Sequence, residues 1–291
     1  MEHQLWKSIV ALLVTLGNKP PSARFDFSDE RIVQVFYWAV IHDRPISWAC
    51  SRKNWPIHLR RQRVPSNSTM SRRLRTAPVR KLLDALEQRV VAPKKPGLFW
   101  VIDGKPLVIG GASHDRQAGF GRAVRGKARG YKIHAIVGRE GIAAWRVAPM
   151  NMDERVMAAR LVRSTTIQGY LVADSNYDSN PLHDVCDQLD ELQLITPRRF
   201  GKSHGLGHHY HSPSRLRSIE RTENPFPEFA NQLLHDRDLI ERSYGNLVNW
   251  GGGLTTLPPW VRTHRRVHRW AQAKLALSTL RHPPDIKTCV A

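Results

Sequence analysis

The sequence of 291 residues has little cysteine, comparatively few acidic residues and no long apolar run. Its three cysteines, Cys50, Cys186 and Cys289, lie too far apart for a Cys-x-x-Cys metal site or a disulfide framework. The longest apolar stretch, residues 9–16, is about half of the ~20 residues that a membrane-spanning helix needs. We therefore expect a protein of a reducing compartment, the cytoplasm, with no membrane segment.

The scarcity of acid leaves a large positive charge. There are 25 Asp and Glu against 45 Lys and Arg, a formal net charge of +20. Hydrophobic residues make up 41% of the chain, which is enough to bury a core and excludes wholesale disorder. A folded chain with this charge attracts polyanions. Nucleic acid is the leading partner, and an anionic membrane surface is the alternative.

The chain changes character at residues 93–97, where two prolines and a glycine around two lysines indicate a linker. Residues 1–92 carry apolar side chains at helical spacing and predict a helical domain. Its expected helices cover residues 30–41, 46–55, a stretch that begins at Ser66 or Ser68 and ends at Arg75, and 77–91.

Residues 98–285 predict a second domain, a mixed α/β sheet flanked by helices. Three apolar runs resemble an antiparallel meander, and two further strands alternate with helices. The expected strands are residues 98–110, 132–138, 142–148, 169–174 and 192–197, and the expected helices are 153–164, 181–191, 228–250 and 265–280. Residues 198–227 are polar and rich in turn-forming residues.

Three acids in this basic chain are candidates for chemistry. Asp103 and Asp174 each end an apolar strand, and Glu241 lies within a predicted helix. If the strands are neighbours and the helix crosses them, three carboxylates converge. Such a cluster binds hard divalent cations, and two Mg²⁺ ions about 4 Å apart can drive phosphodiester cleavage.

Each acid also has an ordinary structural interpretation. An aspartate that ends a strand is often a turn former or a helix cap, and Asp178 competes with Asp174 in the same short stretch. Glu241 can be a surface acid paired with Arg237, one helical turn earlier. Spacing alone does not decide between these interpretations.

Five segments, in order, resemble the bacterial insertion-sequence transposases of the DDE class over roughly residues 99–282. They are VIDGKPL, GYKIHAIVG with the following strand and its Asn-x-Asp, LVADSNYDSN, RDLIERSYGNL and TLPPWVRTHRRVHRWAQAKLAL. Each segment alone has low specificity, whereas their order together is strongly specific.

The resemblance implies an RNase H-like catalytic domain behind an all-α N-terminal domain. It implies that Asp103, Asp174 and Glu241 bind two Mg²⁺ or Mn²⁺ ions, and that Arg237 contacts DNA or orients a carboxylate. The family often has a Tyr before this Arg and a Lys after the Glu, where this chain has Leu234 and Val248. Tyr244, on the same helix face as Glu241, is a candidate replacement for the aromatic and a candidate DNA contact.

Residues 51–81 contain ten Lys and Arg and no acid. A helix, a turn and a serine-capped basic helix are typical of a helix-turn-helix that reads the major groove of DNA. The residues expected to face base edges or phosphates are Ser68, Thr69, Arg72 and Arg73. The alternative is a solvated basic face without sequence preference.

Residues 116–132 are rich in glycine and basic residues, and we expect a flexible loop that clamps a phosphate backbone near Asp103. Its candidate DNA contacts are Arg125, Lys127, Arg129 and Lys132. The Gly-x-Gly within it is no nucleotide fingerprint, because no strand–turn–helix unit surrounds it. We expect His134, on the next strand, to be packed rather than catalytic.

These observations together predict a bacterial DNA transposase that binds the terminal repeats of an insertion element, cleaves DNA and transfers strands. Its partners would be double-stranded DNA and a second copy in a homodimer. Two alternatives stay open: an RNase H-like nuclease without strand transfer, and a decayed DNA-binding relative without enzymatic activity.

Overall fold

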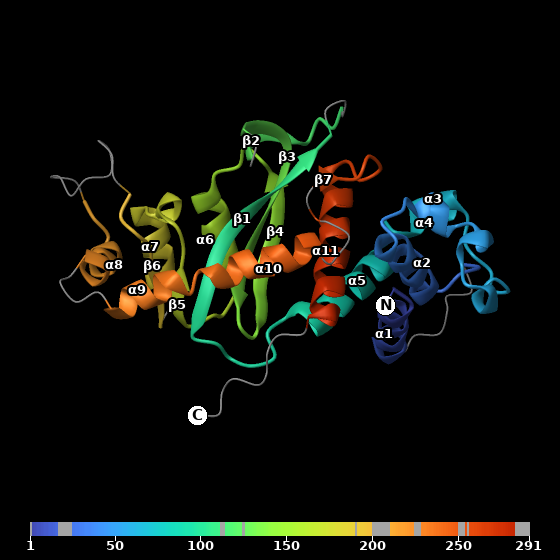
Figure 1. Ribbon diagram of the computed structural model, residues 1–291, viewed down its shortest axis with the longest axis horizontal. Coiled ribbons are helices and arrows are strands. Elements are labelled where there is room, and N and C mark those ends of the chain that lie inside the picture. Colours follow the sequence, from blue (N-terminus) through green and yellow to red (C-terminus); the bar gives the residue numbers. More distant parts are fainter. Residues whose placement is uncertain are drawn as a thin grey trace. The chain divides into compact units, whose positions relative to one another are not determined.

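The computed structural model describes residues 2–16, 25–110, 114–123, 126–189, 191–199, 210–223, 228–249, 254 and 256–282. The chain divides into two compact units (Figure 1). One consists of residues 1–91, 247–254 and 269–283, and the other of residues 92–246, 255–268 and 284–291. The helical unit therefore includes two stretches of the range 98–285. Within the described residues, no helix combines the length and apolarity needed to cross a membrane.

The helical unit is built around a cluster of tryptophans. Its elements before the linker are α1 (Glu2–Leu16), α2 (Asp29–Ile41), α3 (Ile46–Ala49), η1 (Arg52–Asn54), η2 (Ile57–Leu59), α4 (Asn67–Arg73) and α5 (Ala77–Val91). The rings of Trp38 and Trp55 stack with centroids 4.9 Å apart, and Trp6 packs edge-on against both. Such pairs add to the stability that comes from burying apolar area.

Local signals in the sequence set the helix ends of this unit. Ser28 caps α2 by accepting a hydrogen bond from the Arg31 amide at 3.2 Å. Ser66, rather than Ser68, caps α4 by accepting from the Thr69 amide at 3.1 Å. Serine is a favoured N-cap because its hydroxyl satisfies an amide that has no partner in the helix. The expected helices at 30–41 and 77–91 are confirmed within one residue.

The second unit is organised by a seven-stranded mixed sheet. Its elements are β1 (Phe99–Ile109), β2 (Gly119–Ala123), β3 (Gly126–Gly138), β4 (Gly141–Pro149), α6 (Glu154–Val162), β5 (Gly169–Val172), η3 (Ser175–Tyr177), α7 (Asn180–Asp187), β6 (Leu192–Ile195), α8 (Pro213–Glu223), α9 (Glu228–His235), α10 (Asp238–Asn249), β7 (Thr256–Leu257) and α11 (His264–Arg281). Residues of α11 belong to both units.

The strand order identifies the fold. The central strands run β4–β3–β1–β5–β6, in which β3 is antiparallel to both β4 and β1, whereas β1, β5 and β6 are parallel to one another. Helix α6 connects β4 to β5, and α7 connects β5 to β6. Apolar side chains of the sheet and these helices form one core, which includes Ile102, Leu161 and Leu171. This arrangement is RNase H-like, as the sequence predicts, and the N-terminal region is helical as expected.

Four predictions of secondary structure are wrong. The helix expected at 46–55 is a single α-helical turn, α3, followed by the 3-10 helix η1. Residues 119–130 do not form a flexible loop, because they pair as β2 with the beginning of β3. The helix expected at 228–250 is two helices, α9 and α10, separated at Asp236 and Arg237. The polar region 198–227 contains α8, which the abundance of polar residues concealed.

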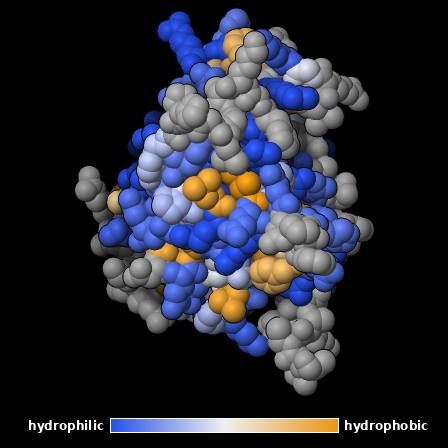
Figure 2. Space-filling view, turned by 90° about the vertical axis from the view of Figure 1, so that its left-hand side faces the viewer, coloured by the Kyte–Doolittle hydropathy of each residue, from blue (hydrophilic) through white to orange (hydrophobic). Residues whose placement is uncertain are grey.

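The face of the molecule seen in Figure 2 is mostly hydrophilic, with hydrophobic residues in a few small areas. Exposed apolar side chains of the described residues include Leu216 on α8 and Phe229 on α9. Isolated apolar residues of this kind are ordinary on protein surfaces. We therefore assign no partner to this face.

Candidate active site

The sheet brings Asp103 and Asp174 to the same edge. Strands β1 and β5 are parallel neighbours, and Val101 pairs with Val172. Asp103 and Asp174 each follow this pair by two residues. In a parallel pair the same register places both aspartates at corresponding positions. The sequence hypothesis required the two strands to be adjacent, and they are adjacent.

Asp103 is a half-buried carboxyl that lies near two other carboxylates. Its Oδ1 accepts a hydrogen bond from the Gly104 amide at 2.7 Å. Its pKa is raised to about 6, chiefly by burial and also by the negative charges of Asp174 and Glu154, although the Gly104 hydrogen bond and Arg237 lower it. A carboxyl in this state gains stability from a nearby cation, because a cation favours the ionised form.

Asp174 is held rigidly at the start of the short helix η3. Its Oδ1 accepts from the Asn176 amide at 2.8 Å, and its Oδ2 from the Asn176 side chain at 3.2 Å. The prediction that an acid of this stretch caps a helix therefore applies to Asp174 itself. Capping uses one lone pair of each oxygen and leaves the carboxylate further acceptor capacity.

Glu154 is an acid that the sequence analysis missed. It stands in the first turn of α6, directly after the N-cap Asp153, and its charge acts on Asp103. Its Oε1 accepts a hydrogen bond from Lys132 Nζ. The only signal in the sequence was its position beside the Asn-x-Asp motif, where an acid in the first helical turn has an ordinary explanation.

Lys132 is consequently held in an ion pair with Glu154. Its side chain is buried, with 9% of the residue exposed, and it pairs with Glu154 rather than extending into solvent. This geometry argues against the predicted contact between Lys132 and DNA. Its stem also lies where a side chain at position 104 would be, because a Cβ built on Gly104 would come within 2.7 Å of Lys132 Cδ.

Helix α10 is tied to β1 by Tyr244. The hydroxyl of Tyr244 donates to the backbone oxygen of Asp103 at 2.8 Å, and only 6% of the residue is exposed. Tyr244 therefore positions the helix against the strand, and its burial argues against a direct DNA contact. Burial, followed by the charge of Asp103, raises its pKa well above the ordinary value, so the hydroxyl stays protonated.

Glu241 lies on this helix but does not join the two aspartates in the structure. Its side chain is 68% exposed, and its Oε1 is 3.9 Å from a guanidinium nitrogen of Arg237. Arg237 is near enough to Asp103 to lower the pKa of that carboxyl. Within the described residues, no three His, Cys, Asp or Glu side chains are grouped closely enough to hold a metal ion.

The donors at this edge nevertheless fit a hard divalent cation. They are carboxylates, which are the ligands that Mg²⁺ and Mn²⁺ prefer. The mutual effect of Asp103, Asp174 and Glu154 is a surplus of negative charge that a cation would relieve. Glu241, one helical turn before Tyr244, is a further carboxylate on the helix that contacts Asp103.

Two further polar residues are buried beside Asp103. His134 pairs with Gly104 across β1 and β3, and neither of its ring nitrogens has a hydrogen-bond partner within the described residues. Burial and then Lys132 lower its pKa to about 3, so the ring is neutral. Tyr177 is fully buried, and burial followed by the charge of Asp103 raises its pKa. The expectation that His134 is packed is confirmed.

Asp178, the competitor of Asp174, has a structural role. Its carboxylate accepts two hydrogen bonds from the Arg215 guanidinium, at 2.6 and 2.8 Å, and one from the Arg199 amide at 2.9 Å. Burial alone would raise its pKa, but the hydrogen bonds from Arg215, His183 and Arg199 lower it below the ordinary range. Ser179, rather than Asp178, is the N-cap residue of α7.

In the helical unit, the candidate DNA contacts on α4 differ in accessibility. Ser68 and Arg72 are exposed and Thr69 is half-buried. Arg73 is buried, donates to Asp29 Oδ1 at 2.6 Å and to the Phe27 oxygen at 2.8 Å, and stacks on the Phe25 ring. This burial argues against a DNA contact by Arg73.

In the sheet unit, the candidates on residues 116–132 lie on the β2–β3 hairpin. Lys127 is exposed, and the Arg129 guanidinium lies 5.6 Å from the centre of the Phe120 ring. Arg125 lies outside the described residues, as does the side chain of Val248.

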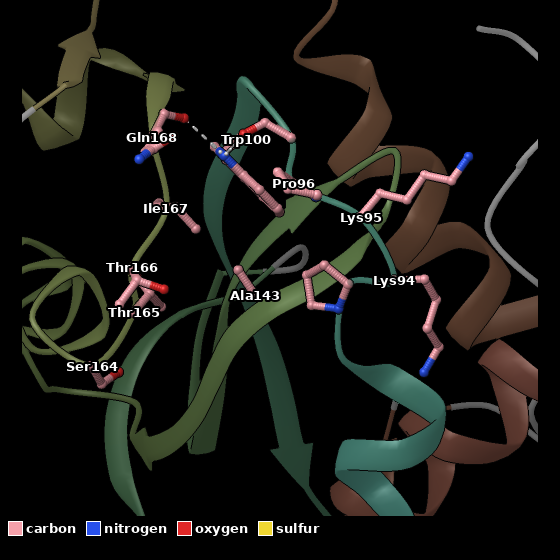
Figure 3. Close-up of a pocket in the computed structure, with 12 residues that line it drawn as sticks. Lys94, Lys95, Pro96, Trp100, Ala143, Ser164, Thr165, Thr166, Ile167 and Gln168 are labelled. Atoms are coloured by element: carbon pink, nitrogen blue, oxygen red, sulfur yellow. Dashed lines mark hydrogen bonds between the residues drawn. The ribbon is translucent and has the colours of Figure 1, made fainter.

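A separate pocket of about 510 Å³ lies where β1 begins. It is lined by residues 93–97 and 164–168 together with Trp100 and Ala143 (Figure 3). Trp100 Nε1 donates to the oxygens of Gly97 and Gln168, both at 3.1 Å, while Lys94 and Lys95 extend away from Ile167. No acid lines this pocket, so its chemistry differs from that of the carboxylate edge.

Comparisons with known proteins identify a family for this chain. The family model described as "Transposase DDE domain" matches residues 94–277, more than half of the chain. No curated protein matches the sequence. The piggyBac transposase, in a synaptic complex with hairpin DNA, is similar in structure with a TM-score of 0.42 and 11% identity, over 96% of this chain and 73% of that one. A likeness this weak carries no argument about the fold, which the strand order identifies.

Proposed function

Because the chain belongs to the family of transposases that carry a DDE domain, we propose that it binds the terminal repeats of a mobile element, cleaves the DNA there and joins the freed 3′-hydroxyl to target DNA. The observation that carries this proposal is the register of β1 and β5, which places Asp103 and Asp174 side by side. A cytoplasmic, DNA-associated location in a bacterium belongs to the same proposal.

We assign the metal ligands to Asp103, Asp174 and Glu241. A pair of Mg²⁺ or Mn²⁺ ions supplies activation of the attacking oxygen and stabilisation of the leaving oxygen of a phosphodiester. Asp103 and Asp174 hold their positions through the Gly104 amide and the η3 cap. Glu241 lies exposed on α10, which the Tyr244 hydrogen bond links to β1, and in this proposal its side chain turns toward the two aspartates to complete the site.

The basic residues hold the substrate in this proposal. Arg237, near Asp103 and 38% exposed, contacts a phosphate beside the scissile bond. Lys127, Arg129 and Arg125 contact the backbone farther along the DNA. Ser68, Thr69 and Arg72 contact the terminal repeat, because Ser68 and Thr69 lie in the first turn and Arg72 in the last turn of α4, a short serine-capped basic helix. Binding two ends at once requires at least a homodimer.

Cleavage assays on a DNA duplex that carries the terminal repeat test the ligand assignment. Asp103→Asn, Asp174→Asn and Glu241→Gln should each lower the cleavage rate by about a thousandfold or more, since a metal site supplies several kcal/mol to the transition state. Binding of the same duplex in metal-free buffer should stay within about twofold.

Two control variants make this test specific. Asp187→Asn removes a half-exposed acid on α7 and should leave cleavage unchanged. Glu154→Gln should retain most activity, because Glu154 already pairs with Lys132. Loss of cleavage in Glu154→Gln with retention in Glu241→Gln would transfer the third ligand to Glu154 and refute the assignment of Glu241.

The two alternative functions have separate signatures. A nuclease without strand transfer would cut the repeat but would not join a pre-cut end with a free 3′-hydroxyl to a second DNA. A decayed DNA-binding relative would bind the repeat without either reaction. Short inverted repeats around the gene, themselves flanked by a direct duplication, would favour the transposase over both.

A further inference from the structure

The β2–β3 hairpin has two chemically different faces. Phe120 pairs with Arg129 and Arg122 pairs with Lys127, so these four side chains lie on one face. The other face consists of glycine or alanine at positions 119, 121, 123, 126, 128 and 130. The glycines that suggest a loop in the sequence are therefore one face of a regular strand pair.

The small-residue face is closely packed at Gly119, Gly121 and Gly130, whereas a Cβ built on Gly126 would meet nothing within 4 Å. A Cβ built on Gly119 would lie 2.0 Å from Asn151 Oδ1, and one on Gly121 would lie 2.5 Å from the Met150 oxygen. The Met150 amide also donates to the Gly130 oxygen at 3.1 Å. Because this face packs against residues that follow β4, the hairpin is anchored and its other face is directed to solvent.

The outward face combines an aromatic ring with cations. Phe120 is 66% exposed, so its ring is accessible to a ligand. The Arg129 guanidinium lies over its ring and also donates to the Ala118 oxygen at 3.3 Å. Arg122 and Lys127 are exposed, and no acid occurs anywhere in residues 116–132.

We propose that the outward face of the β2–β3 hairpin binds DNA at an unpaired nucleotide, whose base stacks on Phe120 while Arg122, Lys127 and Arg129 contact the adjoining phosphates. An exposed ring among cations is how proteins bind single-stranded nucleic acid, because every base has a stacking face and every nucleotide a negative charge. A protein partner would instead call for a larger apolar patch than one ring.

The site has a defined place relative to the acidic edge. Arg129 is six residues along β3 from Ala135, which pairs with Asp103. Six residues of an extended strand span about 20 Å. That length equals roughly six nucleotide steps of a DNA strand at about 3.4 Å each. This position rests on the proposed function, whereas the binding of an unpaired base does not.

Binding in metal-free buffer tests the proposal apart from cleavage. The probes are a DNA duplex with one bulged 2-aminopurine and the fully paired duplex of the same sequence. The wild-type chain should prefer the bulged duplex and quench its fluorescence. Phe120→Ala should weaken binding of the bulged duplex about tenfold and that of the paired duplex less than twofold, since stacking on one base is lost.

Matched variants separate stacking from charge and from folding. Phe120→Trp should keep the preference, and Phe229→Ala, which removes a comparably exposed ring on α9, should not alter it. Arg122→Ala with Lys127→Ala should weaken both duplexes and reduce the salt slope by about two. Equal effects of Phe120→Ala on both duplexes, no effect on either, or a change in oligomeric state instead would overturn the proposal.

Discussion

Asp103 and Asp178 are two poorly accessible carboxyls of the sheet unit with opposite electrostatic surroundings. Asp178 is 1% exposed and receives two hydrogen bonds from Arg215, which lower its pKa although burial opposes this. Asp103 lies beside Asp174 and Glu154, and its pKa is raised to about 6. Arg237 opposes this rise only in part.

The difference supports the metal-binding role proposed for Asp103 and a structural role for Asp178. A buried carboxylate with a bidentate arginine has its charge compensated within the fold. A carboxylate among other carboxylates destabilises the fold unless a cation arrives, so it persists where a cation or a reaction requires it. This contrast, rather than position in the sequence, separates Asp103 from Asp178.

The largest expected effect follows from removing the arginine that compensates the charge of Asp178. Arg215→Ala leaves Asp178 buried without its partner and should lower the free energy of unfolding by about 3–5 kcal/mol. Urea unfolding followed by circular dichroism measures this change. Arg217→Ala on the same helix is the control, because its pair with Asp187 is half-exposed and is worth less than about 1 kcal/mol. Similar losses in both variants would remove the contrast.

In the helical unit, removing the arginine of a partly buried ion pair should also lower stability, but by a smaller amount. Arg73→Ala breaks a pair whose partner Asp29 is 32% exposed, so we expect a loss of about 2 kcal/mol. Arg72→Ala, at an exposed position, should change stability by less than about 0.5 kcal/mol. It should instead reduce by about one the slope of the logarithm of the binding constant for the terminal repeat against the logarithm of the salt concentration. A reduced slope in Arg73→Ala without loss of stability would contradict the structural role of Arg73.

The smallest effect is a gain in stability. Asp103→Asn should raise the free energy of unfolding by about 1–2 kcal/mol at pH 7.5 in EDTA, because it removes an unfavourable charge. The sign follows from the raised pKa: the carboxyl stabilises the fold below pH 3.8, its ordinary pKa, and this stability is lost as the pH rises through about 6.

The pH dependence sharpens the comparison. The gain in the free energy of unfolding from Asp103→Asn should therefore shrink toward pH 4. Saturating Mg²⁺ should reduce this gain at pH 7.5 by stabilising the wild-type chain. Asp178→Asn should behave oppositely and lose stability at pH 7.5. Because the pKa of Asp178 is lowered, its ionised carboxylate stabilises the fold at pH values above its ordinary pKa. Lower stability of Asp103→Asn at pH 7.5 would disprove the charge balance proposed for this edge.

Local patterns in the sequence predicted the framework well. The apolar runs of β1, β3 and β4, the helical spacing of α5 and a serine cap at Ser66 or Ser68 depend on residues only a few positions apart. The placement of Asp103 and Asp174 at strand ends was equally visible. The hairpin at 119–130 was missed because its glycines were interpreted as flexibility, although they alternate with larger residues as a strand requires.

Composition and local periodicity determined by themselves that this chain has a basic surface, a helical region and a mixed sheet with acids at the strand ends. Only the tertiary structure decided which charges are compensated. Asp29 meets Arg73, Asp178 meets Arg215, and Glu154 meets Lys132 across separations of 44, 37 and 22 residues. Periodicity follows from the geometry of one helix or strand, whereas such pairs depend on how several elements pack together.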